Sequence, residues 1–358
     1  MTPTVSGRGT GLRNTPRRWG RILAYIGLGL VVLVALLGVA GFTWNELATR
    51  DEQKAFPPPG RMYEVDGHAM HMYCTGTGSP TLVLDAGLGD DWTVWSKVQP
   101  ELSKTTRVCS FDRSGLGSSD LLPGAHDANT LADQLHALVG RAGIQKPFVL
   151  VGHSIAGLYA RAYASRYPDD LAGMILIDSS TPDQLARMPK EVREAAIPNF
   201  FLQSWTVRLG IARALGQCSE VDPAMEAVKG WVLANMCNPS ITDAGIEEYK
   251  GVDLSNAETR HTGPFGHLPI LIFSEDPAKP PTDWGLSPAV MKQWAALWNQ
   301  MQEELKRLST DSRRIIAKGS GHYIQVERAD LIDREVPLFI DQIRSGNPSP
   351  DKGTTKTE

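Results

Sequence analysis

Short runs of strand-forming residues recur along the chain, and helical patterns separate them. Most of the runs are apolar throughout, which is typical of strands covered on both faces of a sheet. Between two of the runs, residues 130–143 place Leu131, Leu135 and Leu138 on one face of a helix. Because strands that alternate with helices form parallel βαβ units, we expect an α/β fold with a doubly wound, mostly parallel sheet. The runs lie at residues 81–87, 107–112, 148–152, 173–178, 269–274 and 313–319.

One connection between consecutive strand runs is far longer than the others. Residues 179–268 number 90, whereas a crossover with its helix needs only about a dozen residues or somewhat more. The stretch carries helical patterns and large apolar side chains such as Phe200 and Trp205. We interpret it as a helical cap inserted above the sheet, because it is short for a second independent domain. The core then consists of residues 61–178 and 269–346.

The N-terminal region contains 23 consecutive residues without a charge, at positions 22–44. About 20 apolar residues suffice to span a bilayer as a helix, so we expect one transmembrane helix and the lipid bilayer as a partner. Arginines precede this stretch without any acidic residue, whereas charges of both signs follow it. The positive-inside rule therefore predicts a single-pass cell-membrane protein with a cytoplasmic N-terminus and an extracytoplasmic body. The arginines are Arg8, Arg13, Arg17, Arg18 and Arg21.

A cleaved signal peptide is the alternative to a membrane anchor. Residues 38–40 could serve as a small-residue cleavage site, and the body would then be secreted. The remaining segments are polar or rich in proline and glycine. We expect residues 1–21 to form a disordered cytoplasmic tail, residues 45–60 a linker and residues 347–358 a second disordered tail.

Charge and cysteine content narrow the class of protein. The net charge is −4 and the basic residues of the body are dispersed, so we expect no nucleic-acid partner. The four cysteines lack the CxxC spacing of common zinc sites. In an oxidising compartment Cys218 could pair with Cys237, and Cys74 with Cys109, which lies in another predicted strand. Four buried free thiols are the alternative.

Ser154 lies between a predicted buried strand and an amphipathic helix. The stretch "FVLVGHSIAGLYARAY" passes from continuous β-rich character to a helical pattern within a few residues. A turn that sharp strains its central residue and brings strand and helix close together, which requires small side chains such as those of Gly152 and Ala156. The sequence therefore predicts an exposed serine hydroxyl at the carboxyl edge of the sheet, where open α/β folds bind ligands.

The segment "GHSIAG" resembles the nucleophile elbow of the α/β-hydrolase family. The resemblance covers residues 61–346, with "DAGLG", "FDRSGLGSSD" and "GSGHYIQVERADL" in the expected order. The usual motif is G-x-S-x-G, whereas here Ala156 occupies the fifth position. The resemblance implies Ser154 as nucleophile and His322 as general base.

The resemblance also implies the remaining site residues. The acid that orients the histidine usually follows the strand at 269–274, which favours Asp276. Some relatives place it after the preceding strand, which leaves Asp178 as the alternative. The backbone amides of Leu88 and Ile155 would form the oxyanion hole.

The predicted function is that of a serine hydrolase acting on a carboxylic ester or lipid-like acyl substrate. It would use a Ser-His-Asp triad and an acyl-enzyme intermediate, with no metal or organic cofactor. An aminopeptidase-type hydrolase and a non-catalytic ligand-binding protein of this fold are the alternatives. Dehalogenase and epoxide hydrolase chemistries are disfavoured, because the relatives that perform them carry aspartate in place of the serine. The oligomeric state stays open.

Overall fold

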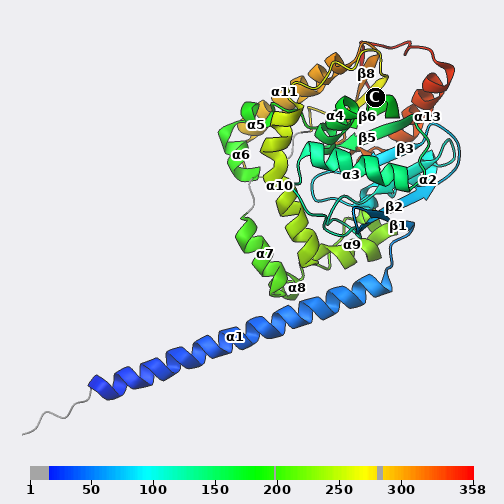
Figure 1. Ribbon diagram of the computed structural model, residues 1–358. Coiled ribbons are helices and arrows are strands. Elements are labelled where there is room, and N and C mark those ends of the chain that lie inside the picture. Colours follow the sequence, from blue (N-terminus) through cyan, green and yellow to red (C-terminus); the bar gives the residue numbers. More distant parts are fainter. Residues whose placement is uncertain (1–15, 197–198, 280–284) are drawn as a thin grey trace, which may run out of the picture.

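A computed structural model describes residues 16–196, 199–279 and 285–358 of the chain. The described residues form a nine-stranded sheet in the order β1-β2-β4-β3-β5-β6-β7-β8-β9 (Figure 1). The β1/β2 and β2/β4 pairs are antiparallel and the other neighbours are parallel, so the mostly parallel, doubly wound sheet is confirmed. The strands are β1 (Arg61–Val65), β2 (His68–Thr75), β3 (Leu82–Asp85), β4 (Val108–Phe111), β5 (Phe148–His153), β6 (Leu171–Ile177), β7 (Ile270–Ser274), β8 (Ser312–Ile316) and β9 (Thr355–Thr357).

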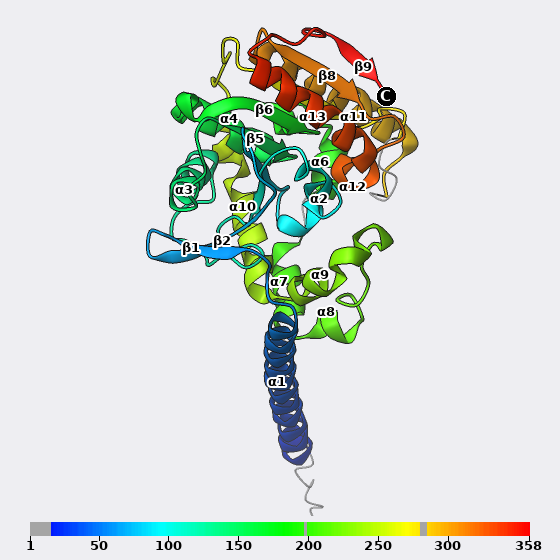
Figure 2. The same ribbon diagram turned by 90° about the vertical axis from the view of Figure 1, so that its right-hand side faces the viewer.

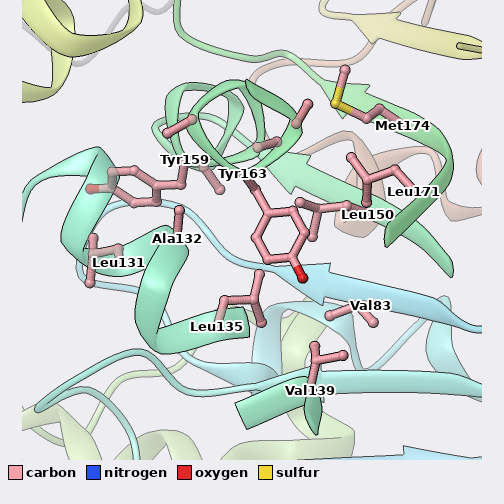
Figure 3. Close-up of a cluster of buried hydrophobic side chains, with 14 of the residues drawn as sticks. Val83, Leu131, Ala132, Leu135, Val139, Leu150, Tyr159, Tyr163, Leu171 and Met174 are labelled. Carbon is pink, nitrogen blue, oxygen red and sulfur yellow. The ribbon is translucent and has the colours of Figure 1, made fainter. Parts of the chain in front are cut away.

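Helices cover both faces of the central strands. Along β5, Leu150 packs with α3 and α4 on one face, whereas Val149 and Val151 belong to the core formed with α13 on the other. Figure 3 shows the first of these cores, in which Tyr163 of α4 lies among side chains of α3 and the sheet. The core helices are α2 (Gln99–Leu102), α3 (Ala128–Arg141), α4 (Ala156–Arg166), α12 (Ile324–Glu327) and α13 (Ala329–Ser345).

A helical region separates β6 from β7 in the sequence and covers one end of the molecule. Figure 2 shows α7, α8 and α9 between the N-terminal helix α1 and the sheet. A further helix, α11, follows β7 and packs on α5 and α6 through Trp294, Met188 and Val192. The helix after β7 is α11 (Pro288–Glu304). The helices between β6 and β7 are α5 (Gln184–Arg187), α6 (Lys190–Ala196), α7 (Phe200–Arg208), α8 (Ile211–Ala214), α9 (Lys229–Met236) and α10 (Pro239–Thr259).

The N-terminal helix α1 (Pro16–Ala55) is longer than expected. It includes the apolar stretch 22–44, and from Trp19 to Ala55 it is long and apolar enough to cross a membrane. The expected linker is wrong over residues 45–55, which contain neither proline nor glycine and continue the helix. Contacts with the cap hold this part in place: Arg213 donates hydrogen bonds to Asn45 (2.9 Å) and Glu52 (3.0 Å). Of the expected tail 1–21, residues 1–15 lie outside the described residues and the rest is helical.

The expected disordered tail at 347–358 is also wrong. Its end forms β9, which pairs in parallel with β8. Without β9, β8 would be the edge strand of the sheet. Gly353 N donates to Ser312 O (2.6 Å) and Lys318 N to Glu358 O (2.8 Å). The side chains of β9 are exposed. Backbone pairing therefore holds this strand, and an apolar pattern could not have revealed it.

Two disulfides join the four cysteines. Cys74 of β2 and Cys109 of β4 stand opposite one another in the antiparallel ladder and are bonded. Cys218 and Cys237 are bonded within the cap, on either side of α9. Both pairings considered from the sequence are therefore present in the structure.

Candidate active site

Ser154 occupies the turn between β5 and α4. Its φ of 55° lies in the left-handed region, which is uncommon for a residue with a side chain. Two backbone hydrogen bonds hold the turn: Ser154 N donates to Ile177 O (3.0 Å), and Ser180 N donates to Ser154 O (2.8 Å). A Cβ at Gly152 would lie 2.7 Å from Ala156 O. The close approach of strand and helix explains why this segment requires small residues.

His322 lies in the loop between β8 and α12 and contacts the serine. Its Nε2 atom is 2.9 Å from Ser154 Oγ, and its Nδ1 atom is 2.6 Å from Asp178 Oδ2. The carboxyl ends of β5, β6 and β8 thus bring a hydroxyl, a carboxylate and an imidazole into one hydrogen-bonded line. Such a line lets the imidazole accept the serine proton while the carboxylate holds the ring.

Asp276, the acid favoured from the sequence, does not lie against His322. Its Oδ2 atom accepts a hydrogen bond from Gly319 N (2.8 Å), and its Oδ1 atom accepts one from Ala278 N (2.9 Å). These two amides lower the pKa of Asp276. The structure therefore gives Asp276 a loop-bracing position and gives the histidine contact to the alternative, Asp178.

Asp178 is buried and fully hydrogen-bonded. It follows β6 directly and has a φ of 42°. Its Oδ1 atom accepts hydrogen bonds from Glu275 N (3.0 Å) and Trp298 Nε1 (2.9 Å), which leaves Oδ2 for His322. Buried carboxylates are costly unless their oxygens are paired in this way.

Burial lowers the pKa of His322, but the hydrogen bond and the negative charge of Asp178 outweigh burial, so the net pKa is raised. Glu275 lies beside this pair, and burial followed by the charge of Asp178 raises its pKa to about 9. Glu275 is therefore a neutral acid at pH 7.

Asp178, Glu275 and His322 offer ligand atoms within 4.8 Å of one another, a separation that a metal ion could bridge. Their chemistry fits a proton-sharing cluster better. Asp178 and His322 are hydrogen-bonded to each other, and the raised pKa of Glu275 opposes the ionised form that a metal ligand needs.

The amides of Leu88 and Ile155 are free for a ligand. Within the described ranges, neither amide donates a hydrogen bond to another protein group. Ile155 N lies at the N-terminus of α4, where the helix dipole favours negative charge. Both amides can therefore donate a hydrogen bond to a bound ligand.

A buried ion network braces the loop that contains Leu88. Arg113 donates to Asp85 Oδ1 (2.6 Å), Ala86 O (2.6 Å) and Gly87 O (2.5 Å) on one side. On the other side its Nε atom donates to Glu248 of the cap helix α10 (2.6 Å). Glu248 also accepts from Gly89 N (3.0 Å). The loop is therefore fixed between the core and the cap.

His153 lies beneath the catalytic histidine candidate. Burial, followed by the charge of His322, lowers the pKa of His153 well below its usual value, so its ring is neutral. Its Nε2 atom is 3.1 Å from the His322 backbone oxygen, which makes it a support for the loop that carries His322.

A pocket of about 460 Å³ lies between this braced loop and the cap. Asp90 lines it and accepts a hydrogen bond from Tyr323 (3.2 Å), the residue next to His322. The pocket has mostly apolar walls, and neither Ser154 nor His322 is among its lining residues. Its lining includes Leu88, Val94, Phe200, Met225, Val232, Met236, Ile241, Ile246 and Tyr249.

Sequence reasoning missed Trp298, Glu248 and the protonation of Glu275. Trp298 lies on a helical face with Trp294, a pattern that predicts packing and gives no hint of a carboxylate partner. Glu248 lies 135 residues from Arg113 in the sequence. No local pattern could have paired them.

Known proteins share this architecture. A family model described as the alpha/beta hydrolase fold matches residues 80–329. The uncharacterized protein YbdG of Bacillus subtilis (strain 168) is 27% identical over 166 residues, covering 46% of this chain and 51% of YbdG. This chain thus spans about half the length of that relative.

Two solved structures extend the likeness over most of the chain. A putative lipase from Acinetobacter baumannii AYE has a TM-score of 0.59 at 17% identity and covers 85% of this chain and 97% of its own. A putative epoxide hydrolase from Pseudomonas aeruginosa has a TM-score of 0.60 at 16% identity, with coverage of 81% and 98%. At these identities the likeness shows the fold alone.

Proposed function

The chain belongs to the α/β-hydrolase fold family, and on that premise we propose that it is a serine hydrolase that cleaves carboxylic esters. The observation that carries the proposal is the line Ser154 Oγ, His322 and Asp178, joined at 2.9 Å and 2.6 Å. A neutral serine hydroxyl is a poor nucleophile and needs this adjacent base. Asp178 replaces Asp276 as the proposed acid.

The proposed reaction proceeds through a covalent intermediate. His322 Nε2 takes the Ser154 proton while Oγ attacks the ester carbonyl carbon, and the resulting imidazolium returns the proton to the departing alcohol. Water then attacks the acyl-enzyme with the same histidine as base. Asp178 keeps the ring in the required tautomer and stabilises its positive form.

The oxyanion of each tetrahedral intermediate would accept hydrogen bonds from the amides of Leu88 and Ile155. Preorganised donors of this kind contribute about 3–4 kcal/mol each in mutagenesis of comparable sites. Arg113 and Glu248 act as positioning residues, because they hold the loop that carries the Leu88 amide.

The mostly apolar pocket beside Leu88 supports a substrate with a hydrophobic acyl or alcohol portion. We propose α1 as a single-pass anchor with a cytoplasmic N-terminus and the hydrolase body outside the cytoplasm. The two disulfides fit such an oxidising compartment.

Labelling with a fluorophosphonate probe tests the enzyme class. The full chain in detergent should label, and Ser154→Ala should not, with hydrolysis of p-nitrophenyl esters lost in parallel. Ser179→Ala serves as a matched control, because Ser179 lies just after β6 and its hydroxyl donates to the backbone oxygens of Gly152 (2.8 Å) and Ile177 (3.5 Å). Folded wild-type protein that neither labels nor hydrolyses any ester would favour a non-catalytic ligand-binding protein.

Aminopeptidase-type chemistry is the second candidate, and Asp90 is the observation that favours it. Its carboxyl lines the pocket and could bind a free amine, although burial, followed by the charge of Asp91, raises its pKa to about 6. Aminoacyl amides tested beside short- and long-chain esters separate the two, since faster amide turnover that requires Asp90 would identify a peptidase.

A further inference from the structure

The cap presents large apolar side chains on the side where α1 extends. Phe201, Leu202 and Trp205 of α7 are exposed, as are Ile211 and Leu215 at α8, with Phe201 76% and Leu215 70% exposed. Within α7, Trp205 lies four residues from Phe201 and three from Leu202, so these side chains share one side of the helix, and Ile211 and Leu215 are likewise four residues apart at α8. We call these five residues the apolar cap patch. Exposed apolar patches of this kind mark interaction surfaces.

We propose that the apolar cap patch inserts into the interface of the bilayer that α1 spans, beside α1 itself. This inference rests on the proposed function, in which α1 is a membrane anchor. Its partner is the lipid surface, and its consequence is that the pocket receives ester substrates from the membrane.

The packing of the cap on α1 sets the depth of the patch. The corner between α7 and α8, Leu209 and Gly210, lies against Gly38 and Gly41 of α1. A Cβ at Gly38 would be 3.8 Å from Leu209 Cδ2, and one at Gly41 would overlap the Leu209 carbonyl oxygen. Both glycines belong to the uncharged stretch that ends at Trp44. At about 1.5 Å per residue, Gly41 lies about 4.5 Å and Gly38 about 9 Å inside that end.

The corner is therefore at the level where apolar helix residues give way to polar ones. Interfacial segments bury their apolar face about 5–10 Å into this boundary, and tryptophan is favoured there. In Figure 1, α7 and α8 lie on the flank of the molecule toward which the apolar part of α1 extends. On α8, Arg213 reaches Asn45 and Glu52, which follow the apolar stretch. The polar contacts thus lie on the water side of the corner.

The same helix connects the patch to the pocket. Phe200 and Gln203 of α7 line the pocket, whereas Phe201, Leu202 and Trp205 are exposed outside it. One short helix therefore forms the wall between the membrane-facing side and the space beside Leu88. A lipid ester whose chain leaves the bilayer at this wall would meet the apolar pocket directly.

Depth-dependent quenching on the full chain tests the insertion. All four cysteines are in disulfides, so a single introduced cysteine can carry an environment-sensitive NBD label. We would label Leu202→Cys in phosphatidylcholine vesicles and add lipids with a doxyl quencher on the acyl chain. Leu338→Cys on α13 is the matched control, because both leucines are about equally exposed, at 57% and 58%. Leu37→Cys within α1 reports on the anchor.

The expected result is at least a twofold loss of fluorescence at positions 202 and 37, with no loss at 338. Quenching at 37 without quenching at 202 would overturn the inference and leave the anchor intact. Absence of quenching at 37 would refute the anchor and the inference together. Labelling of Ser154 with the phosphonate probe is independent of all three outcomes.

A second measurement tests the consequence for substrate delivery. The double variant Leu202→Ser, Trp205→Ser should hydrolyse a long-chain ester embedded in vesicles about tenfold more slowly than the wild type. Its rate on water-soluble p-nitrophenyl acetate should stay unchanged, because neither residue lines the pocket. Delivery from the membrane would be contradicted if the variant matched the wild type on both substrates. An equal loss of rate on both substrates would contradict it as well.

Discussion

The ends of β6 and β7 carry similar residues in different surroundings. Each of these neighbouring parallel strands is followed by an aspartate, Asp178 after β6 and Asp276 after β7. Asp178 is buried and contacts His322, whereas Asp276 binds the amides of Gly319 and Ala278 at the surface of a loop. An acid at the correct edge of the sheet is therefore not sufficient for the role of orienting a histidine.

Two features separate the two ends. Asp178 is the first residue after β6 and has a left-handed backbone conformation. Asp276 is the second residue after β7, because Glu275 is the first. Trp298 of α11 then supplies an indole donor to Asp178. The comparison shows that Asp178 is buried with one oxygen left for His322, whereas backbone amides occupy both oxygens of Asp276.

The largest expected effect separates the two aspartates themselves. Asp178→Asn should lower kcat/KM for ester hydrolysis by about 10²–10⁴-fold, because the imidazole loses the partner that fixes its tautomer. Asp276→Asn should stay within about twofold of the wild type. Steady-state kinetics with matched melting temperatures would measure this. A larger loss for Asp276→Asn would reverse the assignment.

Removing the indole donor should have an intermediate effect on activity. Trp298→Phe keeps the aromatic packing but takes away the hydrogen bond to Asp178, and we expect kcat to fall about tenfold. Trp294→Phe is the control, since Trp294 is also buried on α11 and belongs to the same apolar cluster. If both variants lose kcat equally, packing rather than the hydrogen bond supports Asp178.

Replacing Glu275 and Asp276 by their amides should change the free energy of unfolding in opposite directions. The pKa of Glu275 is raised to about 9, so its contribution to stability is complete below the unfolded-state pKa and is lost as pH rises toward 9. Glu275→Gln should therefore raise the free energy of unfolding at pH 7, by about 1–3 kcal/mol. The stability that Glu275→Gln gains over the wild type should grow between about pH 5 and 9.

Asp276 provides the contrast, because its pKa is lowered by two amides. Its stabilisation is present at neutral pH and is lost as pH falls through the lowered pKa, so Asp276→Asn should destabilise the protein at pH 7. Thermal unfolding of both variants at pH 5, 7 and 9 is the measurement. Shifts of the same sign would show that the two carboxyl groups do not differ as described.

The smallest expected effect is a shift of the pH profile. The pKa of His322 is raised by Asp178 against the effect of burial, and the base must be neutral, so kcat/KM should fall as pH drops through that raised pKa. Asp178→Asn should move this acidic limb to lower pH, and Asp276→Asn should leave it in place. An unmoved limb in Asp178→Asn would mean that another group titrates.

Much of the architecture follows from local sequence. The apolar run before Ser154 and the helical pattern after it predict the strand, the turn and the helix, and Gly152 and Ala156 predict the close approach that the structure shows. The position of His322 after the last apolar run places it at the same edge of the sheet. The contact between the two side chains is observed, and their catalytic roles are our proposal.

The rest depends on contacts between distant segments. The cap contacts helix α1 past residue 44, and β9 is held by backbone pairing with β8 and by hydrogen bonds of Thr355 with Glu303 and Lys306. The brace of Arg113 joins a core loop to a cap helix. These contacts join residues far apart in the sequence, so no local pattern indicates them.

By itself the sequence determined the alternation of strands and helices in the core, the sharp turn at Ser154 and the apolar character of residues 22–44, because each depends on residues close together in the chain. Only the tertiary structure shows which of Asp178 and Asp276 contacts His322. The groups that satisfy the second oxygen of Asp178 come from residues 97 and 120 positions away. A carboxylate's burial and hydrogen bonding are set by what folds around it, and two aspartates after neighbouring strands look alike until that packing exists.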